Sequence, residues 1–178
     1  MIEFPDKKYR IIYADPPWSY RDKAKSGDRG VEFKYPTMPL QEIKDLPIRD
    51  IADENCALFL WATAPQMDKV IEVMEEWGFK YKTIAFTWIK TNKVSGTPFW
   101  GMGNWTRANA EFCLLGTRGK PKRVSASVHS VIMSPIEKHS KKPDETRDRI
   151  VQLMGPLPRI ELFARARVDG WDAWGNEV

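Results

Sequence analysis

The stretch that decides the fold covers residues 9–18 and reads Tyr9-Arg10-Ile11-Ile12-Tyr13-Ala14-Asp15-Pro16-Pro17-Trp18. Its first six residues form a short β-prone run and predict a strand. The two prolines cannot continue that strand, because each has a fixed φ and lacks a backbone N–H. The sequence therefore predicts a strand over 9–14 that stops at a carboxylate and a rigid turn.

Outward from this strand, the chain alternates between strand-like and helix-like segments. Strands are predicted where β-branched and aromatic residues form short apolar runs, at 57–61, 83–89, 110–115, 130–133 and 159–164. Helices are predicted near 40–46, from Met67 to Trp77 with Gly78 as the stop, and over 144–154. This alternation is typical of a mainly parallel α/β sheet. We expect 110–115 and 130–133 to pair as a hairpin, which would supply an antiparallel element.

Length and composition limit the class of protein. A chain of 178 residues suits one domain, so we interpret 1–178 as a single domain. The 42% hydrophobic fraction is ordinary for a globular protein, and no apolar run approaches the roughly 20 residues that span a bilayer. The polar N-terminus gives no support for secretion. Cys56 and Cys113 lie in or beside apolar runs and are expected to be free thiols in a reducing cytoplasm, and no residues have metal-ligand spacing.

Positive charge is concentrated in two places. Residues 118–123 hold four cations in six residues, and 138–142 form a second basic run. Such runs favour a polyanionic partner such as a nucleic acid, although a solvated surface is the more common explanation for a single run. Two polar, glycine-containing stretches, 19–39 and 91–109, show no sustained periodicity and are predicted to be long functional loops.

Asp15-Pro16-Pro17-Trp18 offers a particular chemistry. An exocyclic aromatic amine is a poor nucleophile because its lone pair is delocalised into the ring, so a catalyst needs hydrogen-bond acceptors that converge on the nitrogen. A carboxylate at the end of a parallel strand and a carbonyl turned by fixed prolines supply two such acceptors, and Trp18 adds an aromatic face. Ligands of α/β sheets also bind at that edge. The alternative is a loop that merely ends a strand.

The sequence resembles the MT-A70 family of adenine methyltransferases, whose best-known member is the catalytic subunit of the mRNA adenosine methyltransferase. The resemblance spans nearly the whole chain and rests on these motifs, in the family's order: Asp15-Pro16-Pro17-Trp18, Tyr35-Pro36-Thr37-Met38, Leu58-Phe59-Leu60-Trp61, Trp88-Ile89-Lys90-Thr91-Asn92, Lys142-Pro143-Asp144-Glu145, Ile160-Glu161-Leu162-Phe163-Ala164-Arg165 and Trp171-Asp172-Ala173-Trp174-Gly175-Asn176. It implies a Rossmann-like fold in permuted order, with the catalytic strand near the N-terminus and the cofactor strand near the C-terminus. It also implies S-adenosylmethionine as methyl donor.

The resemblance also implies residue roles. Lys142 would meet the methionine carboxylate of the cofactor, and the cofactor site would further include Asp15, Phe163, Arg165, Arg167, Asn176 and Glu177. Arg167 and Glu177 depart from the mRNA-type enzymes, which have histidine and glutamine there. Strand core is the alternative role for Phe163. Family members also contact the cofactor's adenine with a short segment before the catalytic strand, and residues 2–6 are the candidates for that role here.

For the substrate, the resemblance places Tyr35 over the target adenine and Asn92, Trp100 and Trp105 in a substrate-facing loop. The alternative for an aromatic residue in such a loop is a docking role or ordinary packing. A duplex substrate would have to release its base from the stack, and aromatic stacking offsets part of that cost. The compact chain looks like a bacterial or phage member, for which we expect DNA as the substrate. RNA adenosine methylation is the alternative, and a non-catalytic nucleic-acid-binding subunit is a third. We expect cytoplasmic localisation and allow for a homodimer or a heterodimer with a paralogue.

Overall fold

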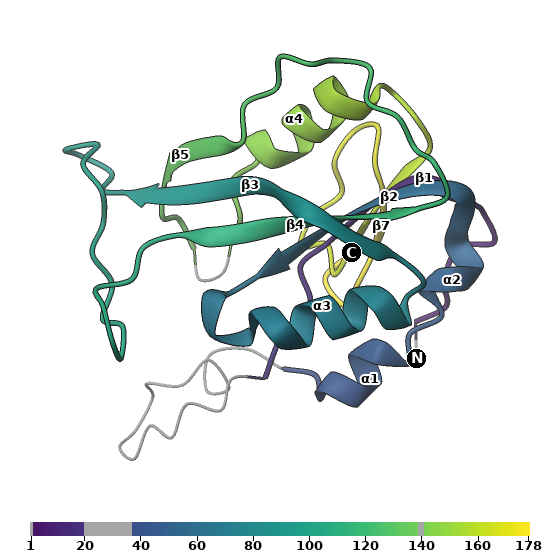
Figure 1. The fold of residues 1–178 in the computed structure, drawn as a ribbon, viewed down its shortest axis with the longest axis horizontal. Coiled ribbons are helices and arrows are strands. Elements are labelled where there is room, and N and C mark those ends of the chain that lie inside the picture. Colours follow the sequence, from purple (N-terminus) through teal and green to yellow (C-terminus); the bar gives the residue numbers. More distant parts are fainter. Residues whose placement is uncertain (1, 20–36, 139–140) are drawn as a thin grey trace.

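The computed structural model describes residues 2–19, 37–138 and 141–178 (Figure 1). Its elements follow in the order β1 (Tyr9–Ala14), α1 (Leu40–Lys44), α2 (Ile48–Ile51), β2 (Ala52–Ala62), a 3-10 turn (Ala64–Gln66), α3 (Met67–Glu76), β3 (Lys80–Thr91), β4 (Glu111–Arg118), β5 (Val131–Pro135), α4 (Glu145–Met154), β6 (Arg159–Leu162) and β7 (Asp172–Trp174). None of the described helices is long and apolar enough to cross a membrane.

Within the described residues, seven strands form one sheet in the order β5-β3-β4-β2-β1-β6-β7. β1 lies between β2 and β6 and is parallel to both. β4 runs antiparallel to its neighbours β2 and β3. The outermost strands pair in parallel, β5 with β3 and β7 with β6. This confirms the α/β, Rossmann-like class and the expected antiparallel strand. The permuted order is visible in β1, which lies beside β6, a strand from the C-terminal part of the chain.

The expected hairpin between 110–115 and 130–133 is wrong. β4 has β2 on one side and β3 on the other, so both of its edges are occupied. The chain after β4 instead crosses to the free edge of β3, where β5 pairs in parallel, with Thr87 opposite Val131. Sequence periodicity identified both strands but carried no information on which edges were free.

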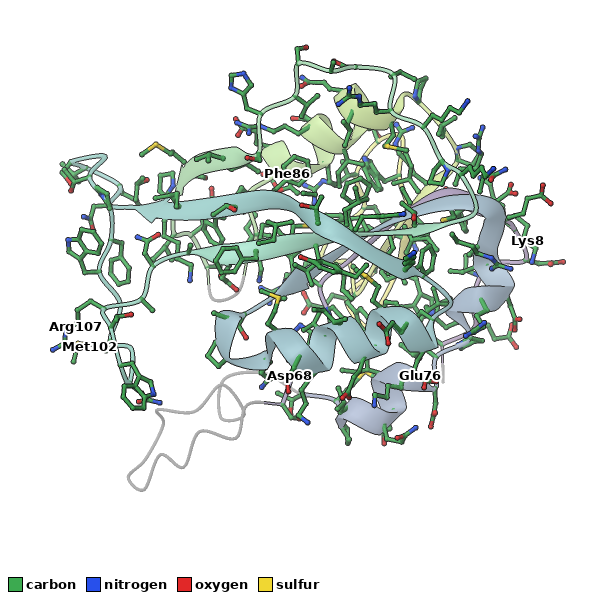
Figure 2. All side chains as sticks on the ribbon, in the orientation of Figure 1. Lys8, Asp68, Glu76, Phe86, Met102 and Arg107 are labelled. Carbon is green, nitrogen blue, oxygen red and sulfur yellow. The ribbon has the colours of Figure 1, made fainter. Side chains whose placement is uncertain are left out.

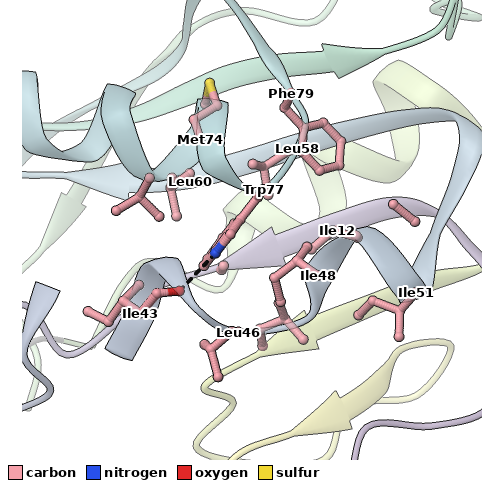
Figure 3. Close-up of a cluster of buried hydrophobic side chains, with 14 of the residues drawn as sticks. Ile12, Ile43, Leu46, Ile48, Ile51, Leu58, Leu60, Met74, Trp77 and Phe79 are labelled. Atoms are coloured by element: carbon pink, nitrogen blue, oxygen red, sulfur yellow. Dashed lines mark hydrogen bonds between the residues drawn. The ribbon is translucent and has the colours of Figure 1, made fainter. Parts of the chain in front are cut away.

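Helices cover both faces of the sheet (Figure 1). On one face, α1, α2 and α3 enclose an apolar cluster that includes Ile43, Ile48 and Trp77 (Figure 3). The Trp77 indole nitrogen donates a hydrogen bond of 2.8 Å to the Ile43 carbonyl and so joins α3 to α1. On the other face, Ile150 and Met154 of α4 pack into a second cluster. Burial on both faces explains why β2 is apolar throughout its second half.

Several strands begin or end together at one end of the sheet. β1, β2 and β6 are parallel, so their carboxyl ends lie together. β4 begins at the same edge, since Phe112 pairs with Ala62 at the end of β2. Arg118 pairs with Cys56, which lies six residues before Ala62 in β2. The basic run 118–123 therefore begins about 20 Å from the carboxyl end of β2, toward the other end of the sheet. The carboxylate that follows β1 and this basic run therefore lie at different ends of the sheet.

Candidate functional site

A cavity of about 320 Å³ opens at the carboxyl ends of β1, β2 and β6. Its volume lies within the range of about 300–1,000 Å³ that small-molecule sites occupy. The lining residues come from both ends of the chain, from the end of β2 and from the start of β4: Asp15, Pro16, Pro17, Trp18, Trp61, Ala62, Thr63, Glu111, Lys142, Phe163, Ala164, Arg165, Asn176 and Glu177.

The turn after β1 is held by its own backbone. The Pro16 carbonyl accepts a hydrogen bond of 2.9 Å from the Trp18 backbone N–H, and the Pro17 carbonyl accepts one of 2.9 Å from Met38. The Trp18 indole nitrogen donates to the Trp61 carbonyl at 3.1 Å, and the Trp18 side chain is buried. Because a carbonyl oxygen has two lone pairs, Pro16 keeps one for a ligand. The turn thus presents Asp15 and the Pro16 carbonyl in a fixed geometry.

Four charged groups form a chain of ion pairs, and three of them, Asp15, Glu111 and Lys142, line the cavity. Lys142 Nζ lies 3.0 Å from Asp15 Oδ2 and 3.6 Å from Glu111 Oε1. Lys90 Nζ lies 3.0 Å from Glu111 Oε2. The Lys142 side chain is only 8% exposed, whereas that of Asp15 is 26% exposed. Lys142 therefore bridges two carboxylates from inside the wall, and Asp15 is the one more open to the cavity.

The surroundings separate the acidities of the two carboxyl groups. Burial raises the pKa of Asp15 above its ordinary 3.8; Lys142 opposes that rise and Glu111 adds to it. Burial also acts to raise the pKa of Glu111, but Lys142 and Lys90 together outweigh it and hold that pKa below its ordinary value. Lys142 thus lowers the pKa of both carboxyl groups, but of the two only the pKa of Asp15 remains above its usual value.

A smaller cavity of about 80 Å³ adjoins the first and shares Asp15, Lys142, Phe163 and Arg165 with it. Arg147 and Glu161 both line this smaller cavity, and Arg147 Nη1 donates to Glu161 Oε1 at 3.1 Å. Burial raises the pKa of Glu161, and Arg147 opposes that rise. The two cavities together form an elongated space with a lysine near the junction, which suits an extended ligand with a charged end.

The end of β6, the strand beside β1, has unusual backbone geometry. Phe163 follows β6 and has a backbone φ of +59°, a left-handed conformation that residues other than glycine rarely adopt. The Phe163 and Trp174 rings pack edge to face, with their centroids 5.1 Å apart. The Ala164 N–H donates a hydrogen bond of 3.0 Å to the Trp174 carbonyl. A Cβ at Gly175 would come within 3.0 Å of the Ala164 nitrogen, so this crossing needs a glycine. Strain of this kind gathers at ligand sites, where the surrounding packing holds it.

Most of the residues predicted for the site from sequence lie on the main cavity. These are Asp15, Pro16, Pro17, Trp18, Lys142, Phe163, Arg165, Asn176 and Glu177. Arg167 is exposed and lines neither cavity. Tyr35 lies outside the described residues. The structure therefore brings the two ends of the chain together, as the permuted order predicts.

The other predicted substrate residues, Asn92, Trp100 and Trp105, lie in the β3–β4 connection, and none of them lines either cavity. Asn92 donates its side-chain amide to Thr97 Oγ1 at 3.1 Å, within the connection itself. Trp105 is 98% exposed. Their substrate roles stay predictions, and the Asn92 geometry also gives it a structural role in shaping the loop.

Glu111 is the main site residue that sequence reasoning missed. It is the first residue of β4, and its position at the cavity follows from β4 running antiparallel to β2. The available signal was a single carboxylate at the start of an otherwise apolar strand. Among the described residues, no group of three His, Cys, Asp or Glu side chains could hold a metal ion.

Comparison with known proteins points to one family. A family model described as MT-A70 matches residues 9–177. The type II methyltransferase M.MunI of Mycoplasma sp is 38% identical over 194 residues, covering 99% of this chain and 80% of that protein. The N(6)-adenosine-methyltransferase catalytic subunit METTL3 of Homo sapiens is 30% identical over 175 residues, covering 96% and 28%. An MT-A70-like N(6)-adenosine-methyltransferase of Arabidopsis thaliana is 30% identical over 174 residues, covering 96% and 24%. The chain thus spans about a quarter of the length of each of these two N(6)-adenosine-methyltransferases.

Proposed function

The chain belongs to the MT-A70 family, and from this premise we propose that it methylates the exocyclic 6-amino group of adenine in DNA, using S-adenosylmethionine. The observation that carries the proposal is the cavity where Asp15, with a raised pKa, faces the aromatic and cationic groups from the other end of the chain. A cytoplasmic location fits the two free, buried cysteines.

The residues present fit S-adenosylmethionine. Lys142 offers a cation to a carboxylate, and Arg165, Asn176 and Glu177 offer polar groups to a ribose and a purine. The two adjoining cavities give the length that an amino acid joined to a nucleoside requires. When bound, this cofactor supplies a methyl group on a positively charged sulfur, which is a good leaving group.

Asp15 and the Pro16 carbonyl activate the amine. Each accepts a hydrogen bond from one N–H of the target amino group, which localises the nitrogen lone pair and directs it away from the ring. Transfer of the methyl group to this nitrogen would leave the nitrogen positive and make its N–H proton acidic. The Asp15 carboxylate holds that proton and passes it to solvent, and its raised pKa suits this task.

Two features favour DNA over RNA as the polymer. The similarity to M.MunI, a type II methyltransferase and thus of a class that acts on DNA, is higher and covers more of that protein than the similarity to METTL3. METTL3 keeps RNA adenosine methylation as the second candidate. A non-catalytic subunit is disfavoured, since Asp15, Lys142 and Asn176 all meet at one cavity.

The test combines a methylation assay with a binding measurement. Matched DNA and RNA oligonucleotides are incubated with the full chain and labelled cofactor, and the product nucleosides are identified by mass spectrometry. We expect N6-methyladenine in DNA, its loss in Asp15→Asn, and retained cofactor binding by calorimetry in that variant. Asp68→Asn, an exposed carboxylate on α3, is the matched control. Full activity in Asp15→Asn would overturn the mechanism, and methylation of RNA alone would overturn the choice of polymer.

A further inference from the structure

The smaller cavity, of about 80 Å³, is lined by a side chain that the proposed mechanism does not use, that of Tyr13. Tyr13 is in β1, two residues before Asp15, and both side chains line this cavity. The strand register places Tyr13 beside Glu161 of β6, which lines the same cavity. Tyr13 is not among the residues that line the main cavity. A ligand group that reaches Tyr13 must therefore enter the smaller cavity.

The Tyr13 side chain is held by its neighbours. It is 3% exposed and belongs to the apolar cluster on the α4 side of the sheet, which also contains Phe86 (Figure 2). Its ring packs against that of Trp171, with the centroids 5.9 Å apart. The Trp61 indole nitrogen donates a hydrogen bond of 2.7 Å to the Tyr13 hydroxyl oxygen. The hydroxyl group is thus positioned before any ligand binds, which lowers the entropy cost of binding to it.

The hydroxyl proton of Tyr13 has no acceptor among the residues that the structure describes. The bond from Trp61 uses the hydroxyl oxygen as an acceptor, so the O–H group remains available as a donor. Burial raises the pKa of Tyr13 well above its ordinary value, so this group keeps its proton at neutral pH. A buried donor without an acceptor is costly, and most such groups in folded proteins have a partner. We therefore expect the acceptor to be a ligand in the cavity that Tyr13 lines.

The smaller cavity carries charges of both signs. Lys142 and Arg165 line it, and so does Glu161, whose carboxylate is 3.1 Å from Arg147 and whose side chain is 15% exposed. An α-amino-acid group has an ammonium and a carboxylate on one carbon atom, so it needs partners of both signs within a short distance. An inorganic anion would lie beside the carboxylates of Asp15 and Glu161 without a positive group of its own to offset them. The cavity therefore suits a zwitterion better than a simple anion.

We propose that the smaller cavity binds the α-amino-acid group of S-adenosylmethionine, where the Tyr13 O–H donates to the carboxylate beside Lys142 and Glu161 accepts from the ammonium. The choice of ligand rests on the function proposed above. Asp15 keeps its role toward the target amine. Tyr13 and Glu161 are thus cofactor-binding residues in addition to those that the sequence predicted.

The test is calorimetry of the full chain with two ligands, S-adenosylmethionine and methylthioadenosine, which keeps the nucleoside and the sulfur but lacks the amino-acid group. Tyr13→Phe should bind S-adenosylmethionine about tenfold or more weakly, because a hydrogen bond to a charged group is lost. The same variant should bind methylthioadenosine as tightly as the wild-type chain does, because this ligand has no group to place in the smaller cavity. A substitution that merely distorted the site would weaken the binding of both ligands.

A control and a second variant complete the design. Tyr9→Phe removes a hydroxyl group from the same strand, but Tyr9 belongs to the cluster on the other face and donates to Asp172 at 2.6 Å. This control should leave both affinities unchanged. Glu161→Gln keeps the size of the side chain and removes its charge, so it should weaken the binding of S-adenosylmethionine and not that of methylthioadenosine. An unchanged S-adenosylmethionine affinity in Glu161→Gln would overturn the ammonium contact.

The outcomes separate this proposal from the function on which it rests. Binding of S-adenosylmethionine that depends on Tyr13, in a chain that methylates no adenine, supports the site and contradicts the function. Adenine methylation together with an unchanged S-adenosylmethionine affinity in Tyr13→Phe overturns the site and leaves the function standing. An equal loss of affinity for both ligands in Tyr13→Phe also overturns the site, as does a wild-type chain that binds no S-adenosylmethionine.

Discussion

Replacing Lys142 with methionine tests the charge chain at the centre of the site. Lys142 Nζ lies 3.0 Å from Asp15, and its side chain is 8% exposed, so water cannot replace the lost cation. A net hydrogen bond to a charged group contributes about 1.5–3 kcal/mol. Taking about 2 kcal/mol for the contact with the cofactor carboxylate, Lys142→Met should weaken S-adenosylmethionine binding about thirtyfold.

The same substitution should alter the pH profile. Asp15 must be ionised to accept a hydrogen bond from the amine, so activity falls as pH drops through its pKa. Lys142 lowers that pKa, whereas burial and Glu111 raise it. Removing the lysine therefore moves the acidic limb of kcat/KM to higher pH.

Calorimetry with S-adenosylmethionine and a pH series of initial methylation rates measure the two effects. Lys138→Met, an exposed residue of the same basic run, is the control, and Lys142→Arg should restore part of the affinity. A cofactor Kd within twofold of wild type in Lys142→Met would refute the carboxylate contact. An unmoved acidic limb would refute the coupling to Asp15.

Three further predictions each concern a single residue. Glu111→Gln removes a negative charge that raises the pKa of Asp15, so the acidic limb of kcat/KM should move to lower pH, opposite to the effect of losing the lysine; a shift in the same direction would contradict the charge chain. Trp18→Phe leaves the Trp61 carbonyl without its 3.1 Å donor and should lower the free energy of unfolding by about 1–3 kcal/mol in a urea titration. Unchanged stability would show that the indole bond is dispensable. Burial raises the pKa of Cys56 to about 12, so Ellman's reagent should not label it until denaturant is added, and labelling of the native chain would show that the thiol is accessible.

The sequence determined the local elements and the chemistry at the turn. The β-prone run ending at Asp15-Pro16-Pro17 predicted β1 correctly, and the apolar period from Met67 with Gly78 as a stop predicted α3. These signals depend on neighbouring residues, so they can be read without the fold. The short α2 and β7 were missed because four and three residues carry no measurable period.

Only the tertiary structure decided which of these elements meet. Residue order identified β4 and β5 but not that β4 lies between β2 and β3 and so excludes the expected hairpin. Register placed Glu111 opposite the end of β2, beside Lys142 from the other end of the chain. Pairing depends on which sheet edges are free and on contacts far apart in sequence, so no local pattern encodes it. The sequence therefore supplied Asp15 and the cations, and the fold set the distances that adjust the acidity of Asp15.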